Sequence, residues 1–236
     1  MNKEEIFQRY SRQVFIDEIG VSGQRKMMAC RVLVIGAGGL GSPVIQYLAA
    51  AGIGTLGIID FDQIELHNLN RQVIFGNNDV GLSKAVVASE FVSNLNPNVR
   101  VQIYPQKLTD DNAESIFANY DIIVDGSDNF TTRYLVNDIC VSLEKPLVYG
   151  SIFGFEGQLS VFNYRGSRNL RDIFPEPPAS EDVPNCDKNG VLGPLPGIIG
   201  SMMAMQVLKI ATDLPVDSNQ LTIINTLNWQ FTKLSF

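Results

Sequence analysis

An apolar strand pattern that runs directly into a cluster of glycines most restricts what this chain can fold into. The segment RVLVIGAGGLGSP covers residues 31–43. Gly36, Gly38 and Gly41 match the spacing G-x-G-x-x-G, and Pro43 stands where a proline in the first helical turn costs no hydrogen bond. Glycine permits a tight turn, and the N–H groups at the start of the following helix face an anion. The segment predicts a strand–turn–helix unit that holds nucleotide phosphates.

Strand and helix patterns alternate through the first 150 residues. Strands are predicted over 31–35, 55–60, 99–104, 121–125 and 147–151, and helices over 40–51, 83–94, 110–118 and 130–143. This alternation predicts an α/β, Rossmann-like fold in which helices cover a mainly parallel sheet. Ligands of such a sheet bind beyond the carboxyl ends of its strands.

The pattern changes after residue 150. A strand over 157–164, a helix over 197–210 and a hairpin over 221–234 predict an antiparallel C-terminal extension of the same sheet. Residues 165–190 between them show little periodicity. A stretch this long without regular structure indicates a functional lid or a disordered segment.

Charge and cysteine content exclude several classes of protein. The net charge of −7 argues against general nucleic-acid binding, which depends on clustered Lys and Arg. The first residues lack the apolar core of a secretory signal, and the nearly uncharged run 44–59 is short and interrupted by glycines, which argues against a membrane span. Three widely spaced cysteines suit a reducing compartment. We expect a soluble cytoplasmic protein.

The glycine loop by itself leaves the chemistry open. Asp60 ends the second predicted strand about 20 residues on, where a carboxylate would hold a ribose hydroxyl. The same arrangement occurs in dehydrogenases, so hydride transfer and other nucleotide chemistry both remain open. Downstream, Arg71 and Lys84 stand among apolar neighbours. Cleavage of a triphosphate favours fixed cations and a metal, so these two residues favour a triphosphate. Alternatively both are solvated charges.

Asp128 is the candidate metal ligand. It follows the predicted strand 121–125, at the edge of the sheet where ligands bind. Magnesium prefers one or two carboxylates together with phosphate oxygens. The alternative is that Asp128 is the N-cap of the helix from Phe130, because Asp is a favoured cap.

Eight segments together are similar to a known family. In order, RYSRQ, GAGGLGSP, DFD, NLNRQ, VGLSKA, DGSDN, GFEGQ and GPLPGIIGSMMAMQVLK resemble the MoeB/ThiF/HesA group, the bacterial relatives of the ubiquitin-activating enzymes. The resemblance runs from about residue 5 to residue 234. It implies a single adenylation domain over 1–236, made of N-terminal helices 1–30, a nucleotide-binding half 31–150 and a carrier-binding half 151–236 with a mobile loop.

The resemblance also implies a reaction. ATP and Mg²⁺ would activate the C-terminal Gly-Gly carboxylate of a small ubiquitin-fold sulfur-carrier protein as an acyl adenylate, with release of pyrophosphate. Asp60 would bind the ribose, Asp128 would bind Mg²⁺, and Arg12 would reach the triphosphate of the neighbouring subunit in a symmetric homodimer. The full set of implied nucleotide-binding residues is Gly36, Gly38, Gly39, Gly41, Asp60, Asp62, Asn68, Arg71, Lys84, Asp128 and Asn129.

The sequence departs from this family at its cysteines. Many members bind zinc through two Cys-x-x-Cys pairs; here Asn169 and Asp172 replace the first pair and no second pair follows, so no zinc is expected. Cys186 matches a cysteine with which some members form a covalent intermediate with the carrier, and the alternative is an inert surface thiol. Cys30 and Cys140 are expected in the core.

Two other functions remain open at this point. A nicotinamide-dependent oxidoreductase fits the glycine loop and Asp60, although His67 is its one obvious catalytic acid. His67 is instead expected to line the nucleotide site passively. A non-catalytic carrier-binding scaffold fits the missing zinc ligands, but Arg12, Arg71 and Lys84 are all present.

Overall fold

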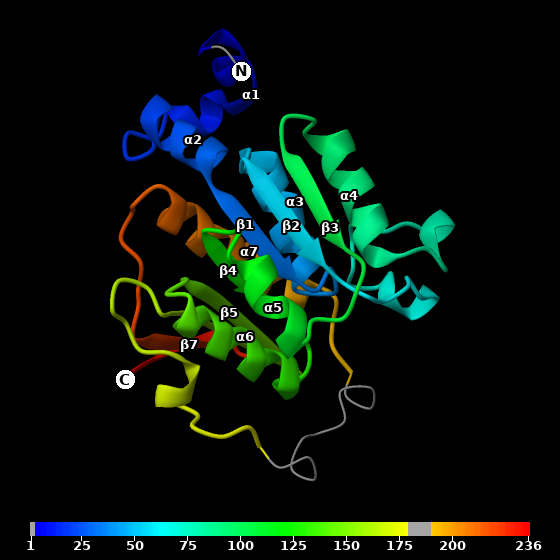
Figure 1. Cartoon of the computed structure of the whole chain (residues 1–236), viewed down its shortest axis with the longest axis vertical. Coiled ribbons are helices and arrows are strands. Elements are labelled where there is room, and N and C mark those ends of the chain that lie inside the picture. The colour runs from blue at the N-terminus through cyan, green and yellow to red at the C-terminus, as the bar shows by residue number, and fades with distance from the viewer. Residues whose placement is uncertain (1–2, 179–189) are drawn as a thin grey trace.

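A single sheet organises the described part of the chain, residues 3–178 and 190–236 of the computed structural model (Figure 1). Within these residues eight strands are hydrogen-bonded in the order β3-β2-β1-β4-β5-β6-β7-β8. Their bounds are Arg31–Ile35 for β1, Thr55–Ile59 for β2, Arg100–Tyr104 for β3, Ile122–Asp125 for β4, Leu147–Phe153 for β5, Glu156–Phe162 for β6, Gln220–Asn225 for β7 and Gln230–Ser235 for β8.

The strand directions confirm the expected fold class. β3, β2, β1, β4 and β5 pair in parallel, and β6, β7 and β8 add to the β5 edge in antiparallel pairs. β1 pairs with β2 on one side and with β4 on the other, so Ile35 stands beside both Ile59 and Asp125. The strand order therefore reverses between β1 and β4, and the crevice beyond the carboxyl ends of these two strands is where such sheets bind ligands.

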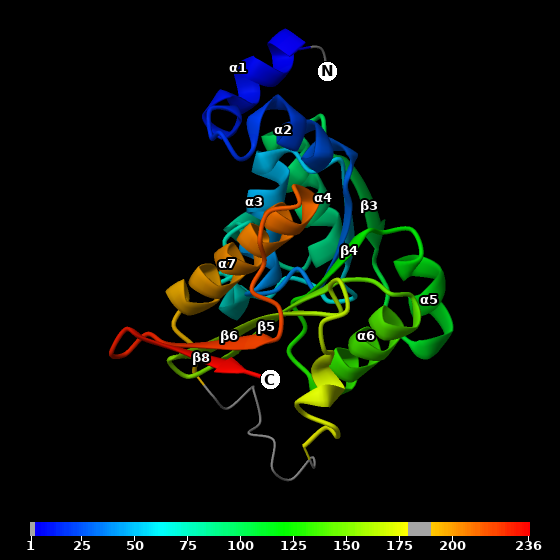
Figure 2. The ribbon, with the colours of Figure 1, turned by 90° about the vertical axis from the view of Figure 1, so that its left-hand side faces the viewer.

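Helices cover both faces of the sheet (Figure 2). The layer on one face packs into the larger apolar core and the layer on the other into a second core. The first layer contains α2 (Gly20–Ala29), α3 (Gly41–Ala51), α4 (Lys84–Leu95) and α7 (Pro194–Ala211), and the second contains α5 (Asp110–Phe117) and α6 (Phe130–Ser142). The short 3₁₀ segments are η1 (Leu66–Asn68), η2 (Asn77–Asp79) and η3 (Leu170–Asp172).

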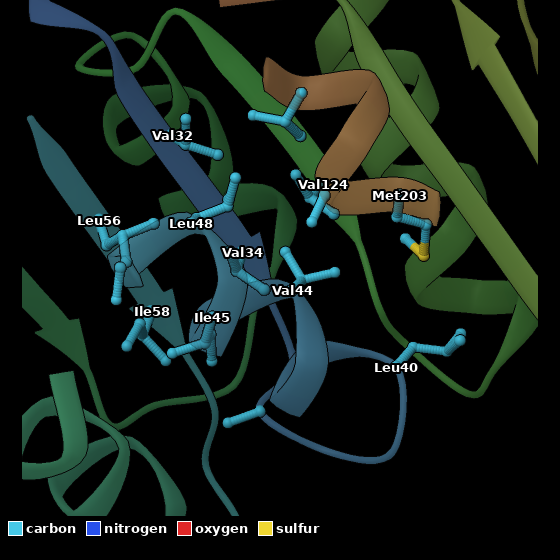
Figure 3. Packing of buried hydrophobic residues seen from close by; sticks show 14 of the residues in the cluster. Val32, Val34, Leu40, Val44, Ile45, Leu48, Leu56, Ile58, Val124 and Met203 are labelled. Carbon is cyan, nitrogen blue, oxygen red and sulfur yellow. The ribbon is translucent and has the colours of Figure 1, made fainter. Parts of the chain in front are cut away.

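Strand β1 is buried on both of its faces. Val32 and Val34 belong to the larger core, while Leu33 and Ile35 belong to the second core. Figure 3 shows Val34 beside Val44 and Ile45 of α3. This double burial explains why the strand reads as a continuous apolar run rather than as an alternating one.

The N-terminal helix α1 (Lys3–Val14) packs at the end of the molecule away from the carboxyl ends of the parallel strands. The Arg9 guanidinium donates to the carbonyl oxygen of Leu95, the last residue of α4, at 3.1 Å. The Asn96 amide donates to the Tyr10 hydroxyl at 2.8 Å. α1 therefore lies at the amino-end side of the sheet, as Figure 1 also shows.

Helix α7, among the described helices, has the length and mean hydropathy of a membrane span. Its buried residues Leu195, Ile199, Met203 and Val207 belong to the larger core, and the helix packs on α3, β5 and β6. Burial against the sheet thus accounts for part of its apolar composition, since 44 % of the helix is buried.

The expectation that Cys30 and Cys140 are core residues is confirmed. Cys30 is 9 % exposed and Cys140 is fully buried. Burial raises the pKa of Cys30 to about 12 and raises that of Cys140 as well. Neither is a reactive thiolate near neutral pH. Cys186 lies outside the described residues.

Candidate nucleotide-binding site

The glycine loop follows β1 with the tight geometry that its sequence predicts. Gly36 has a φ of +86°, a left-handed conformation that favours glycine. A Cβ at Gly41 would overlap the carbonyl oxygen of Gly36, so the start of α3 approaches the loop too closely for any side chain. A Cβ at Gly38 would meet the Gln72 amide nitrogen at 3.6 Å, which is an ordinary contact. The backbone of the loop is therefore closely packed at Gly41 and open at Gly38.

Alanine at these two glycines should have different effects on folding. Gly41→Ala forces the loop backbone to move, and we expect it to lower the free energy of unfolding by at least about 2 kcal/mol. Gly38→Ala, the matched control, should change it by less than about 1 kcal/mol. Urea unfolding of both variants measures the difference. Equal stability of the two would contradict the described packing of the loop.

Asp60 ties the glycine loop to the segment that follows β2. Its Oδ2 accepts from the backbone N–H of Ala37 at 2.8 Å, and its Oδ1 accepts from the N–H of Asp62 at 2.8 Å. The side chain is 8 % exposed, and burial raises its pKa despite these two bonds. The predicted ribose ligand therefore also fixes the loop.

Lys84 is not a solvated charge, so that alternative is wrong. It is the first residue of α4 and is 6 % exposed, and its Nζ lies 2.8 Å from Oδ2 of Asp62. A cation is unfavourable at a helix N-terminus, and burial adds to its cost. The ion pair with Asp62 compensates in part. Asp62 also borders an open cavity of about 650 Å³ lined by residues 61–66, 80 and 81.

The segment around Arg71 packs against the glycine loop. The Arg71 Nη1 donates to the carbonyl oxygen of His67 at 3.0 Å and to the Asn70 Oδ1 at 3.1 Å. A Cβ at Gly39 would lie 3.7 Å from the Cδ of Arg71. The half-buried Arg71 thus lies beside the glycine loop, with both of its guanidinium hydrogen bonds exposed to solvent.

Asn68 is buried and His67 is exposed. The Asn68 Oδ1 accepts from the Glu65 N–H at 3.0 Å, and its Nδ2 lies 3.1 Å from the His67 Nε2. The His67 side chain is 65 % exposed. Asn68 therefore shapes the turn η1, which brings Arg71 back to the glycine loop.

The loop after β4 lies directly against the glycine loop. The Gly126 N–H donates to the Ile35 carbonyl oxygen at 2.9 Å, and a Cβ at Gly36 would lie 3.1 Å from the Gly126 carbonyl oxygen. Asp128 follows two residues later and is exposed. The two loops meet where the strand order reverses, so Asp128 and the glycine loop share the expected ligand-binding edge.

Helix α6 is capped by Asn129, so the alternative of Asp128 as its N-cap is wrong. The Asn129 Oδ1 accepts from the Thr132 N–H at 2.9 Å. Within the described residues no group of three or more His, Cys, Asp or Glu side chains could hold a metal by itself. Mg²⁺ beside nucleotide phosphates needs one or two carboxylates, so the exposed carboxylate of Asp128 fits that kind of site.

One residue implied by the resemblance, Arg12, is not at this edge. Arg12 is exposed on α1, which packs at the amino-end side of the sheet. Within one chain the structure does not bring Arg12 to the glycine loop. Cys186 is outside the described residues, so its position stays a prediction.

Asn169 and Asp172 form a local cap in place of a metal-binding pair. The Asp172 Oδ2 accepts from the N–H and the amide of Asn169, both at 2.8 Å. Between them, the Arg171 guanidinium pairs with Asp138 of α6 at 2.7 Å and lies 4.8 Å from the centroid of the Tyr134 ring. These contacts attach the start of the segment 169–178 to α6.

The Arg171–Asp138 pair should make this attachment depend on pH. The hydrogen bond from Arg171 lowers the pKa of Asp138 in the folded state, so its stabilisation is present above the unfolded pKa and is lost as pH falls through the lower folded value. We expect the melting-temperature difference between wild type and Asp138→Asn to shrink below about pH 4. Asp17→Asn is the control. The same pH dependence in both variants would contradict the role of the pair.

Sequence analysis did not single out Arg133, the fourth residue of α6. Its guanidinium is buried and donates to the carbonyl oxygens of Ser127 and Gly150, both at 2.8 Å. The available signal was a cation near a helix N-terminus, five residues after Asp128.

Comparison with known proteins agrees with this architecture. The ThiF family model matches residues 10–236. The chain is 45 % identical to the sulfur carrier protein adenylyltransferase of Thermus thermophilus, over 99 % of this chain and 88 % of that protein. It is 50 % identical to the adenylyltransferase and sulfurtransferase MOCS3 of Xenopus laevis, over 94 % of this chain and 50 % of that protein.

The MOCS3 relatives are longer proteins, and this chain spans about half of their length. Among solved structures, E. coli MccB shares the fold with a TM-score of 0.86 at 24 % identity, over 97 % of this chain and 71 % of that one. The expected resemblance to the MoeB/ThiF group is confirmed, because the family model covers nearly the whole sequence. This chain belongs to the ThiF family.

Proposed function

We propose that this protein is an ATP-dependent adenylyltransferase that activates the C-terminal Gly-Gly carboxylate of a small ubiquitin-fold sulfur carrier, similar to ThiS or MoaD. The pathway would be thiamine, molybdenum-cofactor or related sulfur-transfer biosynthesis, in the cytoplasm. One observation carries the proposal. The glycine loop and the Asp128 loop meet at the strand-order reversal, with Arg71 packed beside the glycine loop and Lys84 linked to it through Asp62 and Asp60. The 45 % identity to a sulfur carrier protein adenylyltransferase supports it.

The proposed step is a displacement at phosphorus. A carboxylate oxygen of the carrier forms a bond to the α-phosphorus of ATP while the bond from that phosphorus to the bridging oxygen breaks, and pyrophosphate leaves with the electron pair. No general base is required, because a terminal carboxylate is ionised at neutral pH. The protein therefore contributes orientation and charge neutralisation.

The residues of the nucleotide-binding half would share these tasks. Asn68, Arg71 and Lys84 would hold the phosphates, the glycine loop would approach the nucleotide, and Asp60 would hold the ribose. Asp128 would hold a magnesium ion, which neutralises phosphate charge when it is bound. Asp62 and Asn129 would support the same site, and residues 151–236 would bind the carrier.

We further propose a symmetric homodimer in which Arg12 completes the site of the neighbouring subunit. The position of α1 at the amino-end side of the sheet supports this, because it keeps Arg12 away from the glycine loop of its own chain. Arg12→Ala and Asp128→Ala dimers should each be inactive, but random mixing of their subunits should restore about a quarter of the wild-type sites. Recovery of exchange activity on mixing measures this. No recovery from dimers shown to have exchanged subunits would contradict the role of Arg12.

The proposed reaction is tested by exchange of labelled pyrophosphate into ATP, with Mg²⁺, in the presence and absence of a panel of ubiquitin-fold proteins that end in Gly-Gly. Exchange that depends on one carrier is the expected result. Carrier binding that is insensitive to ATP, without exchange, would instead indicate a scaffold. NADH binding would favour the oxidoreductase alternative, against which the family membership of the chain argues.

A further inference from the structure

Arg133 is a buried cation in an unfavourable place. It is 6 % exposed and lies near the N-terminus of α6. Burial of a guanidinium is costly, and the positive end of a helix dipole disfavours a cation. Such a residue persists only where its contacts compensate for both effects.

The contacts of Arg133 join three segments of the chain. Its Nη1 donates to the Gly150 carbonyl oxygen of β5, and its Nη2 donates to the Ser127 carbonyl oxygen of the loop after β4, both at 2.8 Å. The guanidinium also lies 5.0 Å from the centroid of the Tyr149 ring and 4.0 Å from Oδ2 of Asp125. Arg133 therefore holds the β4 loop against β5 and α6.

All of the polar groups of Ser127 form hydrogen bonds. Its N–H and its hydroxyl both donate to Oδ1 of the fully buried Asp125, at 2.9 and 2.6 Å. Its carbonyl oxygen accepts from Arg133. Asp125 and Arg133 thus hold the same residue from its two sides. The next residue along the chain is Asp128, so the backbone that carries its carboxylate has little freedom to move.

The same loop is also fixed against the glycine loop. Gly126 donates to the carbonyl oxygen of Ile35 and packs against Gly36. Arg133 consequently determines where the Asp128 backbone lies relative to the loop that is proposed to hold the phosphates. A lysine would keep the charge near Asp125, but it has no planar fork to reach two carbonyl oxygens in fixed directions.

We propose that Arg133 is a positioning residue for the metal-binding carboxylate of the site. It touches neither nucleotide nor metal. It holds the Ser127 carbonyl so that the Asp128 carboxylate meets a divalent cation that is carried by the nucleotide phosphates. This inference rests on the proposed adenylyltransferase function, in which Asp128 is the magnesium ligand.

The test is Arg133→Lys, with metal binding as its readout. Mn²⁺ is titrated into protein saturated with a non-hydrolysable ATP analogue and followed by electron paramagnetic resonance, without carrier. We expect the Mn²⁺ dissociation constant to rise at least about tenfold, as for other residues that orient a metal ligand. In parallel, the Mg²⁺ concentration for half-maximal pyrophosphate exchange should rise, while metal-free ATP affinity stays unchanged.

Arg171→Lys is the matched control. Arg171 also contacts a carboxylate and a tyrosine ring, both on α6, and it donates to the backbone carbonyl oxygen of Pro175. This substitution should lower stability without changing Mn²⁺ binding. If Arg133→Lys does not fold, Arg133→Met decides by the same titration, because it removes both bonds to the carbonyl oxygens, and a rise of at least about tenfold is expected. Unchanged Mn²⁺ binding in a folded Arg133→Lys protein, or in Arg133→Met if that decides, overturns the inference. Absence of carrier-dependent exchange in wild type would instead overturn the proposed function.

Discussion

Replacement of Asp128 by alanine is expected to reduce carrier-dependent pyrophosphate exchange by at least about a hundredfold, the usual cost of removing one electrostatic stabiliser of the transition state. Asp128 is exposed, two residues after the Gly126 that contacts the glycine loop, and Asn129 rather than Asp128 caps α6. The substitution therefore leaves the helix cap intact. The free energy of unfolding should change by less than about 1 kcal/mol.

Asp121 offers a matched control at the opposite end of the same strand. It immediately precedes β4 and pairs with Arg31 at 2.6 Å. Asp121→Ala should therefore lower stability but leave exchange intact, which is the reverse of the result for Asp128→Ala. The two variants separate a catalytic effect from a folding effect. Full exchange activity in Asp128→Ala would remove Asp128 from the mechanism.

Replacement of Lys84 by methionine should have a similarly large effect on activity. Lys84 is buried at the first turn of α4 and pairs with a carboxylate that is itself half exposed to water. Methionine fills a similar volume and leaves Asp62 able to be solvated, so we expect folding to be retained. If Lys84 holds the phosphates, kcat/KM for ATP should fall by at least about a hundredfold.

The matched control for Lys84→Met is Lys26→Met. Lys26 pairs with Asp213 at 2.9 Å on an exposed surface, so its loss should change neither exchange nor stability appreciably. Steady-state exchange at varied ATP measures both variants. Near wild-type kcat/KM in a folded Lys84→Met protein would mean that Lys84 serves only to neutralise Asp62.

The regular elements could be predicted because their signals are local. The apolar run of β1 and the glycines after it determine a buried strand and a tight turn wherever they occur. Boundaries shifted by one to three residues, as at the end of β2 and at the start of α7, because the end of an element depends on its neighbours. The alternative of Asp128 as the N-cap was wrong because the neighbouring Asn129 is an equally favoured cap and takes that position.

The contacts of the site depend on residues far apart in the sequence. Lys84 meets Asp62 across 22 positions, and Arg133 meets Gly150 across 17. No local pattern distinguishes such a buried cation from a solvated one. Likewise, Asn169 and Asp172 stand in the sequence where many family members have a zinc-binding pair, but only the fold reveals that they cap η3.

Transfer of AMP to the carrier tests the proposed adenylation most directly. ATP labelled at its α-phosphate is incubated with the protein, Mg²⁺ and Gly-Gly carriers, and label in each carrier is measured by gel electrophoresis and intact mass. The expected result is one AMP attached to the C-terminal carboxylate of a carrier, in equal amount to the pyrophosphate released, and none with Asp128→Ala. A folded protein that binds ATP and the carrier but leaves every carrier unmodified, without pyrophosphate release, would contradict it.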